Sequence, residues 1–349
     1  FLAITMLALW VGRKELRRSL AAAFGRPVAA RDPLQLARPS AASPAPGGDR
    51  AERPQPVSRT TDDLAAPRWA VWGFLLTFGA MVAFCLAAGM SFPVAAILLG
   101  LSLAYLVAAT RIRAETGNAW LFGPRVDPQT LLVTTVGTKH LRPQDLTIMA
   151  YLASISGFDL RCVSMPHQLD AFKLAEARRL PRNPLAGALV IALALGLPFA
   201  FWSALAVWHD VGALAKAETW RTMMGKQPFD RLGGYLQNPQ PPNLVELFFV
   251  SGGYLLTAAL FAARTKFLAW PFHPVGYAMA NTASMGNQWF PFLLAWSAKT
   301  LLLRYGGPRL YRQAQPFFVG LVVGDLLNGA LSTILACFIA NMKVYPINW

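Results

Sequence analysis

Charged residues are scarce in this 349-residue sequence: Asp, Glu, Lys and Arg make up 14% of it, whereas soluble globular domains contain about 25%. Hydrophobic residues make up 55%, and this balance excludes an ordinary soluble enzyme. In a soluble protein the net charge of +15 would indicate nucleic acid binding. Here the basic residues stand in short clusters beside apolar runs, a pattern typical of membrane topology. We therefore expect the lipid bilayer, and no nucleic acid, as the partner of this chain.

Residues that build metal and disulfide sites are also few. The sequence holds three cysteines and four widely separated histidines, so it lacks the spacing of a disulfide framework or a Cys-based metal site. It contains no Gly-Lys-Ser/Thr phosphate loop, no Gly-x-Ser-x-Gly elbow, no His-Glu-x-x-His and no Cys-x-x-Cys. We therefore predict no catalytic residue, no metal and no cofactor. An intramembrane enzyme is an alternative that would need paired carboxylates or a histidine cluster.

The first segments suggest a chain that begins inside a helix. Residues 1–12 are apolar but supply only about half of the 20 residues that a spanning helix needs, so we expect the end of a truncated transmembrane helix and missing upstream helices. Residues 13–68 carry 11 basic and 6 acidic residues, and prolines recur along this stretch. Such a segment cannot bury enough apolar surface to offset the entropy of ordering. It is predicted to be a Pro/Ala/Arg-rich cytoplasmic linker.

Long apolar runs predict an all-α fold, a polytopic transmembrane helical bundle with re-entrant or broken helices. A transmembrane hairpin is expected at 69–110. Residues 111–182 are expected to form a cytoplasmic segment with a re-entrant pair of short apolar runs and one amphipathic helix. A C-terminal transmembrane bundle follows at 183–349, with spans at about 184–208, 244–263, 267–283, 287–303 and 316–340.

Basic clusters give the orientation of this bundle. If the predicted spans alternate, all of the clusters fall on one side of the membrane. The positive-inside tendency then places that side in the cytoplasm. We expect a multi-pass protein of the bacterial inner membrane whose C-terminus lies outside. The clusters are residues 13–18, 111–113, 178–182, 264–266 and 304–312.

Asp325 is the first candidate for a substrate or ion path, because it lies near the middle of the last predicted span. A carboxylate at this depth is costly and should face the bundle interior or a water-filled cavity. Asn328, three residues on, shares its helical face. The alternative is a carboxylate that serves only helix packing. Gly320 and Gly324 would let another helix approach closely beside it.

A second candidate is the region of Pro271 and Pro274, where two prolines remove backbone donors inside an apolar run. This predicts a broken helix, and secondary transporters expose backbone groups to substrates at such breaks. His273, Asn281 and Gln288 would add side-chain contacts to the path. The alternative is a proline-kinked helix in which a backbone carbonyl satisfies His273.

Adjacent glycines mark a third weak point. Gly252 and Gly253 lie inside the predicted span 244–263, and each glycine lowers helix stability by about 1 kcal/mol relative to Ala. They indicate either a hinge or a contact between crossing helices.

Four short motifs carry a family resemblance: Arg113–Gly117, Phe272–Tyr277, Trp296–Thr300 and Gly320–Asn328. Together they resemble an uncharacterised bacterial membrane family related to oligopeptide transporters, in its C-terminal portion. The resemblance implies a many-helix, proton-driven secondary transporter of peptides or metal chelates. The Asn-Pro-Gly and Lys-Ile-Pro-Pro-Arg motifs of the peptide-carrying branch are absent, which leaves the substrate open.

The sequence thus favours a secondary transporter of peptides or similar small polar solutes, in which Asp325 responds to protons. The alternative is a non-transporting membrane subunit or scaffold, with a homo-oligomer or a membrane complex as its partner. The long proline-rich linker and the glycine-lined helix surface favour that alternative.

Overall fold

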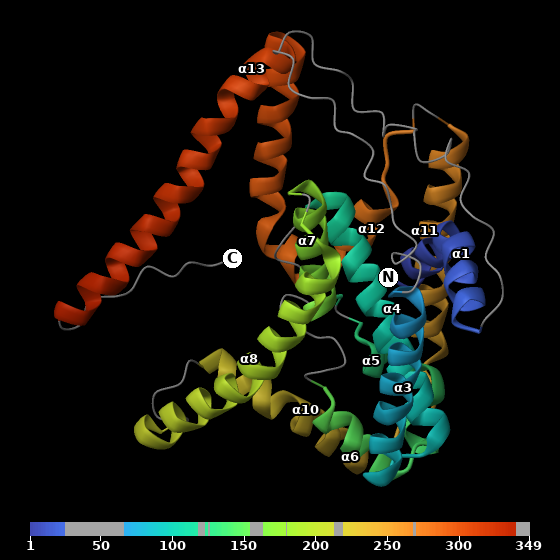
Figure 1. The fold of residues 1–349 in the computed structure, drawn as a ribbon. Coiled ribbons are helices and arrows are strands. Elements are labelled where there is room, and N and C mark those ends of the chain that lie inside the picture. The colour runs from blue at the N-terminus through green and yellow to red at the C-terminus, as the bar shows by residue number, and fades with distance from the viewer. Residues whose placement is uncertain are drawn as a thin grey trace.

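The fold was analysed in a computed structural model, which describes residues 1–24, 66–117, 123–124, 126–153, 163–178, 180–212, 219–267 and 270–339. Helices dominate these residues and no strand is assigned among them, apart from one isolated β-bridge (Figure 1). The predicted all-α class is therefore confirmed. Most of the predicted linker, residues 25–65, and the predicted external tail, residues 340–349, lie outside the described residues.

Helices long and apolar enough to cross a membrane indicate a multi-pass membrane protein. Among the described residues there are five such stretches. They contain the predicted hairpin and most of the predicted C-terminal spans, with bounds shifted by a few residues. The stretches are Trp69–Ala87, Phe92–Thr116, Pro184–Asp210, Leu244–Lys266 and Gln288–Phe338.

Helices α1 (Leu2–Ala23), α3 (Ala66–Ala87) and α4 (Phe92–Thr116) pack against one another. Phe1 stacks on Tyr105 of α4 with ring centroids 5.5 Å apart. Helix α1 does not end at residue 12, as the sequence suggested, but continues to Ala23. The basic residues that follow Gly12 keep a helical backbone because they project from the helix into solvent, where their charges cost little.

Basic clusters from separate segments meet at one end of this bundle, the Thr116 end of α4. Helix α1 starts beside the middle of α4, and its last turn lies beside the first turns of α3, where Trp72 Nε1 donates to the Ala23 carbonyl. Helix α7 (Ser164–Ala177) joins the same end through Arg113, whose Nη2 lies 2.7 Å from Asp170 Oδ2. Helix α7 covers most of the predicted amphipathic helix 167–179.

The predicted short runs form two nine-residue helices, α5 (Pro128–Val136) and α6 (Pro143–Tyr151), joined by the 3₁₀ turn η2 (Thr138–His140). Helix α5 packs against α4 and α11 (Leu244–Lys266), while α6 packs against α10 (Thr219–Gln237). Neither short helix could cross a bilayer alone. The predicted runs are residues 131–136 and 146–158, and the last part of the second, residues 154–158, lies outside the described residues.

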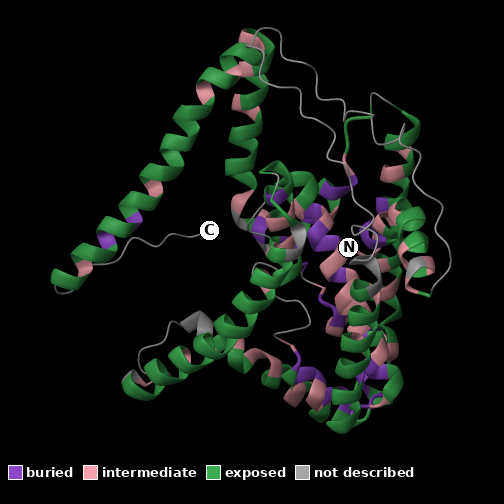
Figure 2. Cartoon of the chain, in the orientation of Figure 1, coloured by how far each residue is buried: buried purple, intermediate pink, exposed green. Residues whose placement is uncertain are grey.

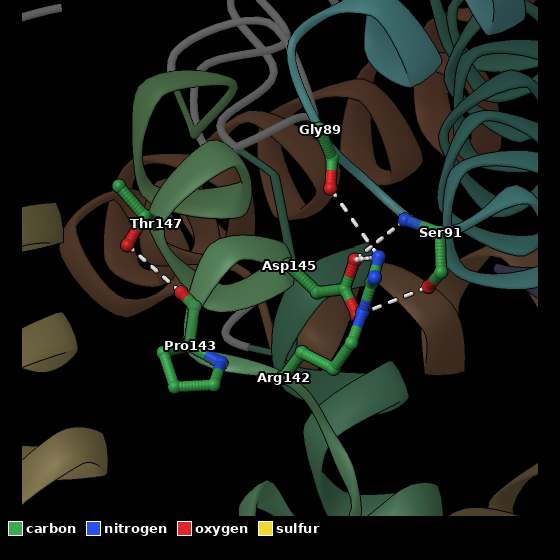
Figure 3. A network of polar contacts seen from close by, with 6 residues as sticks. All are labelled: Gly89, Ser91, Arg142, Pro143, Asp145 and Thr147. Atoms are coloured by element: carbon green, nitrogen blue, oxygen red, sulfur yellow. Dashed lines mark hydrogen bonds and ion pairs between the residues drawn. The ribbon is translucent and has the colours of Figure 1, made fainter.

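An ionic clamp fixes α6 to the other end of α4, the Ser91 end (Figure 3). Asp145 is buried, and its carboxylate accepts from the Ser91 N–H at 2.6 Å and from the Ser91 hydroxyl at 3.0 Å. Arg142 Nε donates to the same carboxylate at 3.1 Å, and Arg142 Nη2 donates to the Gly89 carbonyl at 3.2 Å. The clamp therefore satisfies a buried charge and the turn between α3 and α4 together.

The C-terminal region differs most from the predicted spans. The predicted span 267–283 is wrong: its described residues 270–273 are not helical and lead into the seven-residue α12 (Pro274–Ala280), because the prolines deny the chain a continuous helix. Helix α13 (Ala283–Phe338) then covers both later predicted spans and the basic segment between them. Its two arms meet at Gly307, where φ is 63° and ψ is −170°. Helix α10 lies between two of the predicted spans, 184–208 and 244–263, where no helix is expected from the sequence.

Two apolar segments stand apart from the body: α8 (Arg182–Val211) and the second arm of α13 (Figure 1). None of the residues in the apolar stretch of α8 is buried, and in the second arm of α13 only Gly329 and Ser332 are (Figure 2). Their side chains therefore face the surroundings of the chain. A surface this apolar is typical of contact with lipid or with another transmembrane helix.

We expect Gly137→Ala to lower the stability of the fold by at least about 2 kcal/mol. Gly137 has φ 79°, and a Cβ at this position would lie 2.6 Å from the Pro242 nitrogen. The change can be measured by thermal unfolding in detergent. The matched control is Gly79→Ala in α3, where a Cβ would meet nothing within 4 Å. It should be neutral or slightly stabilising, and equal melting temperatures for the two variants would contradict the close contact.

We expect Asp145→Ala to cost about 2 kcal/mol of unfolding free energy at neutral pH. Burial alone raises the pKa of the Asp145 carboxyl, but the hydrogen bonds from Arg142 and Ser91 outweigh it and hold this pKa below its ordinary value. Ionised Asp145 thus stabilises the fold above about pH 4, and this contribution is lost as the pH falls through the lower folded pKa.

The difference in melting temperature between wild type and Asp145→Ala should accordingly shrink in acid. Glu176→Ala is the control, because the pair of Lys173 and Glu176 lies 79% and 54% exposed and such surface pairs contribute little. A difference between wild type and Asp145→Ala that is constant from pH 7 to pH 3 would contradict the assignment.

Candidate functional site

Two interruptions of helical structure meet beside the middle of α4. The segment that leads into α5 contacts the junction between α12 and α13, where Pro124 and Thr282 form an antiparallel β-bridge. The hydroxyl of Tyr105, near the middle of the 25-residue α4, donates to the Val126 carbonyl at 3.0 Å. Two non-helical segments, far apart in sequence, thus lie at the level of the centre of a membrane-length helix.

Helix caps stabilise both helices that begin at this junction. Asp127 caps α5, since its Oδ1 accepts from the Thr130 N–H at 2.6 Å, and Pro128 follows in the first turn. Thr282 caps α13 and accepts from the Met285 N–H at 3.3 Å. Both caps are buried, with 7% of Asp127 and 2% of Thr282 exposed. The N-terminal ends of α5 and α13, which carry partial positive charge, therefore meet at the junction.

A cavity of about 230 Å³ adjoins Asp127, between α5, α6 and α10. Arg231 of α10 enters it and places Nη1 3.3 Å from Asp127 Oδ2. The polar groups of Gln129, Gln227 and Tyr235 line it as well. Its remaining wall is mostly apolar, formed by Leu146, Met149, Ala150, Ala153, Met224, Pro228 and Leu232. The cavity thus combines one buried carboxylate, one guanidinium and an apolar surface, a composition typical of sites for small ligands.

His273 lies near the Thr116 end, on the far side of the junction from this cavity. Its Nδ1 accepts from the Val275 N–H at 3.1 Å and caps α12, while its Nε2 lies 3.8 Å from Glu115 Oε2. Burial lowers the pKa of the imidazole, and the positive charge of Arg264 lowers this pKa further, against the opposing effect of Glu115. His273 is therefore neutral at pH 7, so its contact with Glu115 is not an ion pair.

Ion pairs link the elements around His273. Glu115 accepts from Arg111 Nε at 2.8 Å within α4, and Arg113 joins α4 to Asp170 of α7. Next to these ion pairs, α12 packs through Val275 and Met279 into a core that includes Ile4, Ala108, Ala109 and Ile112. The Thr116 end is therefore packed, and the cavity that adjoins Asp127 is on the other side of the junction.

The candidate residues of the last predicted span do not lie at the cavity that adjoins Asp127. Asp325 is partly buried and Asn328 is exposed, both on the second arm of α13, and neither lines the cavity at Asp127. At Gly320 and Gly324 an added Cβ would meet no described atom within 4 Å. The close helix contact expected at these glycines is thus not made by the part of the chain that the structure describes.

The proline and glycine residues of the other two candidate regions lie nearer the junction. Pro271 belongs to the extended segment before α12, and Pro274 occupies the first turn of α12. A Cβ on Gly253 would lie 3.4 Å from the hydroxyl of Tyr277 in α12, whereas one on Gly252 would meet nothing within 4 Å. Gly253 therefore lies at a helix contact.

Two predicted polar residues flank the junction itself. Asn281 directly follows α12 and is exposed, while Gln288 is half-buried in the first turns of α13. Together with His273 they border the break that the sequence predicted, but the structure does not place them in the cavity at Asp127.

Asp127 and Arg231 were missed by the sequence reasoning. The Asp127-Pro128 pair is a helix-start signature, an N-cap followed by proline, and it could have revealed the start of α5. No comparable signal marks Arg231, because its helix carries mixed polar and apolar residues with Pro228 inside. Among the described residues, no group of three His, Cys, Asp or Glu side chains converges as a metal site would require.

Comparison with known proteins gives a family but no characterised relative. No curated protein and no solved structure matches this chain. One family profile matches residues 1–348, nearly the whole chain, and carries the description "Family of unknown function (DUF6785)". The prediction of an uncharacterised family is thus confirmed, whereas the comparisons give no support for a relation to oligopeptide transporters. The chain belongs to the DUF6785 family.

Proposed function

We propose that this chain forms part of a secondary transporter for small polar solutes, with its solute path at the junction of α5, α12 and α13. The observation that carries the proposal is the meeting of two interrupted segments beside the middle of α4, next to a cavity that holds the buried Asp127. Secondary transporters place their substrate and ion sites at such discontinuous helices near the bilayer midplane.

The polar groups of the non-helical backbone explain why a solute path would lie at this junction. Irregular backbone at membrane depth is tolerated where protein covers it or where it lines a water-filled cavity. The hydroxyl of Tyr105 and the β-bridge of Pro124 with Thr282 cover part of this junction, and the cavity adjoins the rest. A buried ionisable group at this depth is costly and is typical of a functional site. Asp127 is therefore our first choice for the residue that exchanges protons during transport.

The distribution of charge supports an orientation in the bacterial inner membrane. The Thr116 end of α4 gathers basic residues from α1, α4 and α11, so the positive-inside tendency favours this end in the cytoplasm. The cavity at Asp127 then faces outward, while the contacts among α4, α7 and α12 close the cytoplasmic side. Such an arrangement corresponds to an outward-facing state, and alternating access requires those contacts to open.

The test is proton movement driven by solutes in liposomes that contain the full-length protein and an internal pH-sensitive dye. Separate pools of amino acids, dipeptides, sugars and organic acids are added outside. We expect at least one pool to acidify the interior of wild-type vesicles, and Asp127→Asn to reduce that rate at least tenfold. Asn removes the titrating group but remains a good helix cap, so α5 should be retained.

Asp325→Asn is the informative companion variant, because Asp325 was the carboxylate that the sequence favoured. If Asp127 is the coupling group, Asp325→Asn should retain most of the solute-driven acidification. Glu176→Gln, which changes an exposed carboxylate of α7 that pairs with the surface residue Lys173, controls for the loss of one charge. No acidification by any pool, or full activity of Asp127→Asn, would overturn the proposed path.

A membrane scaffold is the second candidate function, and the exposure of α8 and of the second arm of α13 favours it. Transmembrane helices that stand apart from their own body are suited to packing against another protein. Purification in mild detergent separates the two proposals. A stoichiometric partner protein, together with no solute-driven flux, would support the scaffold, whereas flux by the isolated protein would exclude a purely structural role. Neither proposal assigns an enzymatic reaction to this chain.

A further inference from the structure

We infer that the cavity at Asp127 binds a zwitterionic solute of amino-acid size with an apolar side chain. This inference rests on the proposed function for the location of the site, but binding can be tested without transport. The residues that carry it are Asp127 and Thr130 of α5, Met149 of α6, and Gln227, Arg231 and Tyr235 of α10.

The two opposite charges of the cavity are only loosely joined to each other. Asp127 Oδ2 and Arg231 Nη1 are 3.3 Å apart, whereas charge-assisted N–H···O contacts are typically about 2.7–2.9 Å. Arg231 also keeps 40% of its side chain exposed, while the Asp127 side chain is 11% exposed. A guanidinium carries five N–H donors, and one of them makes this contact. Both groups therefore have capacity for a ligand that would enter between them.

Charge balance selects the class of ligand. An ammonium group on Asp127 and a carboxylate on Arg231 would replace one long contact by two shorter ones. A zwitterion thereby leaves no charge unpaired. A simple amine would leave Arg231 without its partner, and a simple carboxylic acid would do the same to Asp127. This penalty is large for the buried carboxylate of Asp127 and smaller for Arg231, which keeps 40% of its side chain exposed.

The walls and the volume narrow the class further. Leu146, Met149 and Leu232 form an apolar side of the cavity, which suits an aliphatic side chain. The volume of about 230 Å³ is below the range of about 300–1,000 Å³ for drug-sized ligands. A single apolar amino acid fits this space better than a peptide. L-Leucine is therefore the probe of choice.

Binding can be measured by calorimetry on the full-length protein in detergent, with three probes that share the isobutyl side chain and differ in which charged groups they carry. We expect L-leucine to bind at least tenfold more tightly than isoamylamine, which lacks the carboxylate, and than 4-methylpentanoate, which lacks the ammonium. Glycine, which lacks the aliphatic side chain, should also bind at least tenfold more weakly.

Charge-specific variants make the assignment sharper. Arg231→Gln should lower the affinity for L-leucine at least tenfold. The affinity for isoamylamine should stay the same or rise, because Asp127 is then free for an amine. Asp127→Asn should lower the affinity for L-leucine and isoamylamine, whereas the affinity for 4-methylpentanoate should stay the same or rise. Lys226→Gln, an exposed change on the same helix that does not line the cavity, should bind all probes as wild type does, and it reports any general effect of charge loss on α10.

The outcomes separate this inference from the transport proposal. Equal affinity for the three charge probes, or no L-leucine binding by folded wild type, would overturn the zwitterion assignment. If another solute pool still drives flux that depends on Asp127, the transport proposal stands while this inference fails. Charge-selective binding of L-leucine without flux by any pool would support the site and refute transport.

Discussion

Backbone polar groups that leave a helix inside a membrane need partners, since the hydrocarbon core offers none. Under our proposal this constraint acts where the segment before α5 and the segment between α12 and α13 lie beside the centre of α4. Tyr105 supplies a donor to one segment, and the β-bridge joins the two. The side chains of Asp127 and Thr282 then cap the helices that start there. Each break is thus stabilised by the presence of the other.

The short helices depend on the same junction. A nine-residue helix has few hydrogen bonds of its own, so tertiary packing must supply most of its stability. Helix α5 obtains this packing from α4 and α11, and α6 obtains it from α10 and from the clamp at Asp145. Gly137 allows the close contact with Pro241 and Pro242 that holds the α5–η2 corner against the segment preceding α11. These contacts fix the position of the cavity wall.

Charge has two separate roles in this molecule. Arginines and lysines gather at the Thr116 end, where the proposed orientation puts the cytoplasm, whereas the carboxylates of Asp127 and Asp145 are buried among packed helices. Asp145 is satisfied from all sides by Arg142 and Ser91, and it acts as a structural clamp. One oxygen of Asp127 accepts from the first turn of α5, and the other lies 3.3 Å from a partly exposed arginine that lines a cavity. Asp145 thus has all of its hydrogen-bond partners close by and is structural, whereas Asp127 has a weakly held partner and is a candidate binding group.

The sequence by itself determined the helical class, most of the apolar spans and the break near Pro271 and Pro274, because hydropathy, length and the missing proline donor act locally. It also indicated two short apolar runs, at residues 131–136 and 146–158, which lie partly in α5 and α6. Only the tertiary structure decided which polar residues share a cavity. Arg231 lies 104 positions from Asp127 in the chain, and no periodicity predicts such a contact. Conversely, Asp325 had the same local signature as a buried site residue, but the backbone changes direction at Gly307 and the second arm of α13, which carries Asp325, extends away from the junction.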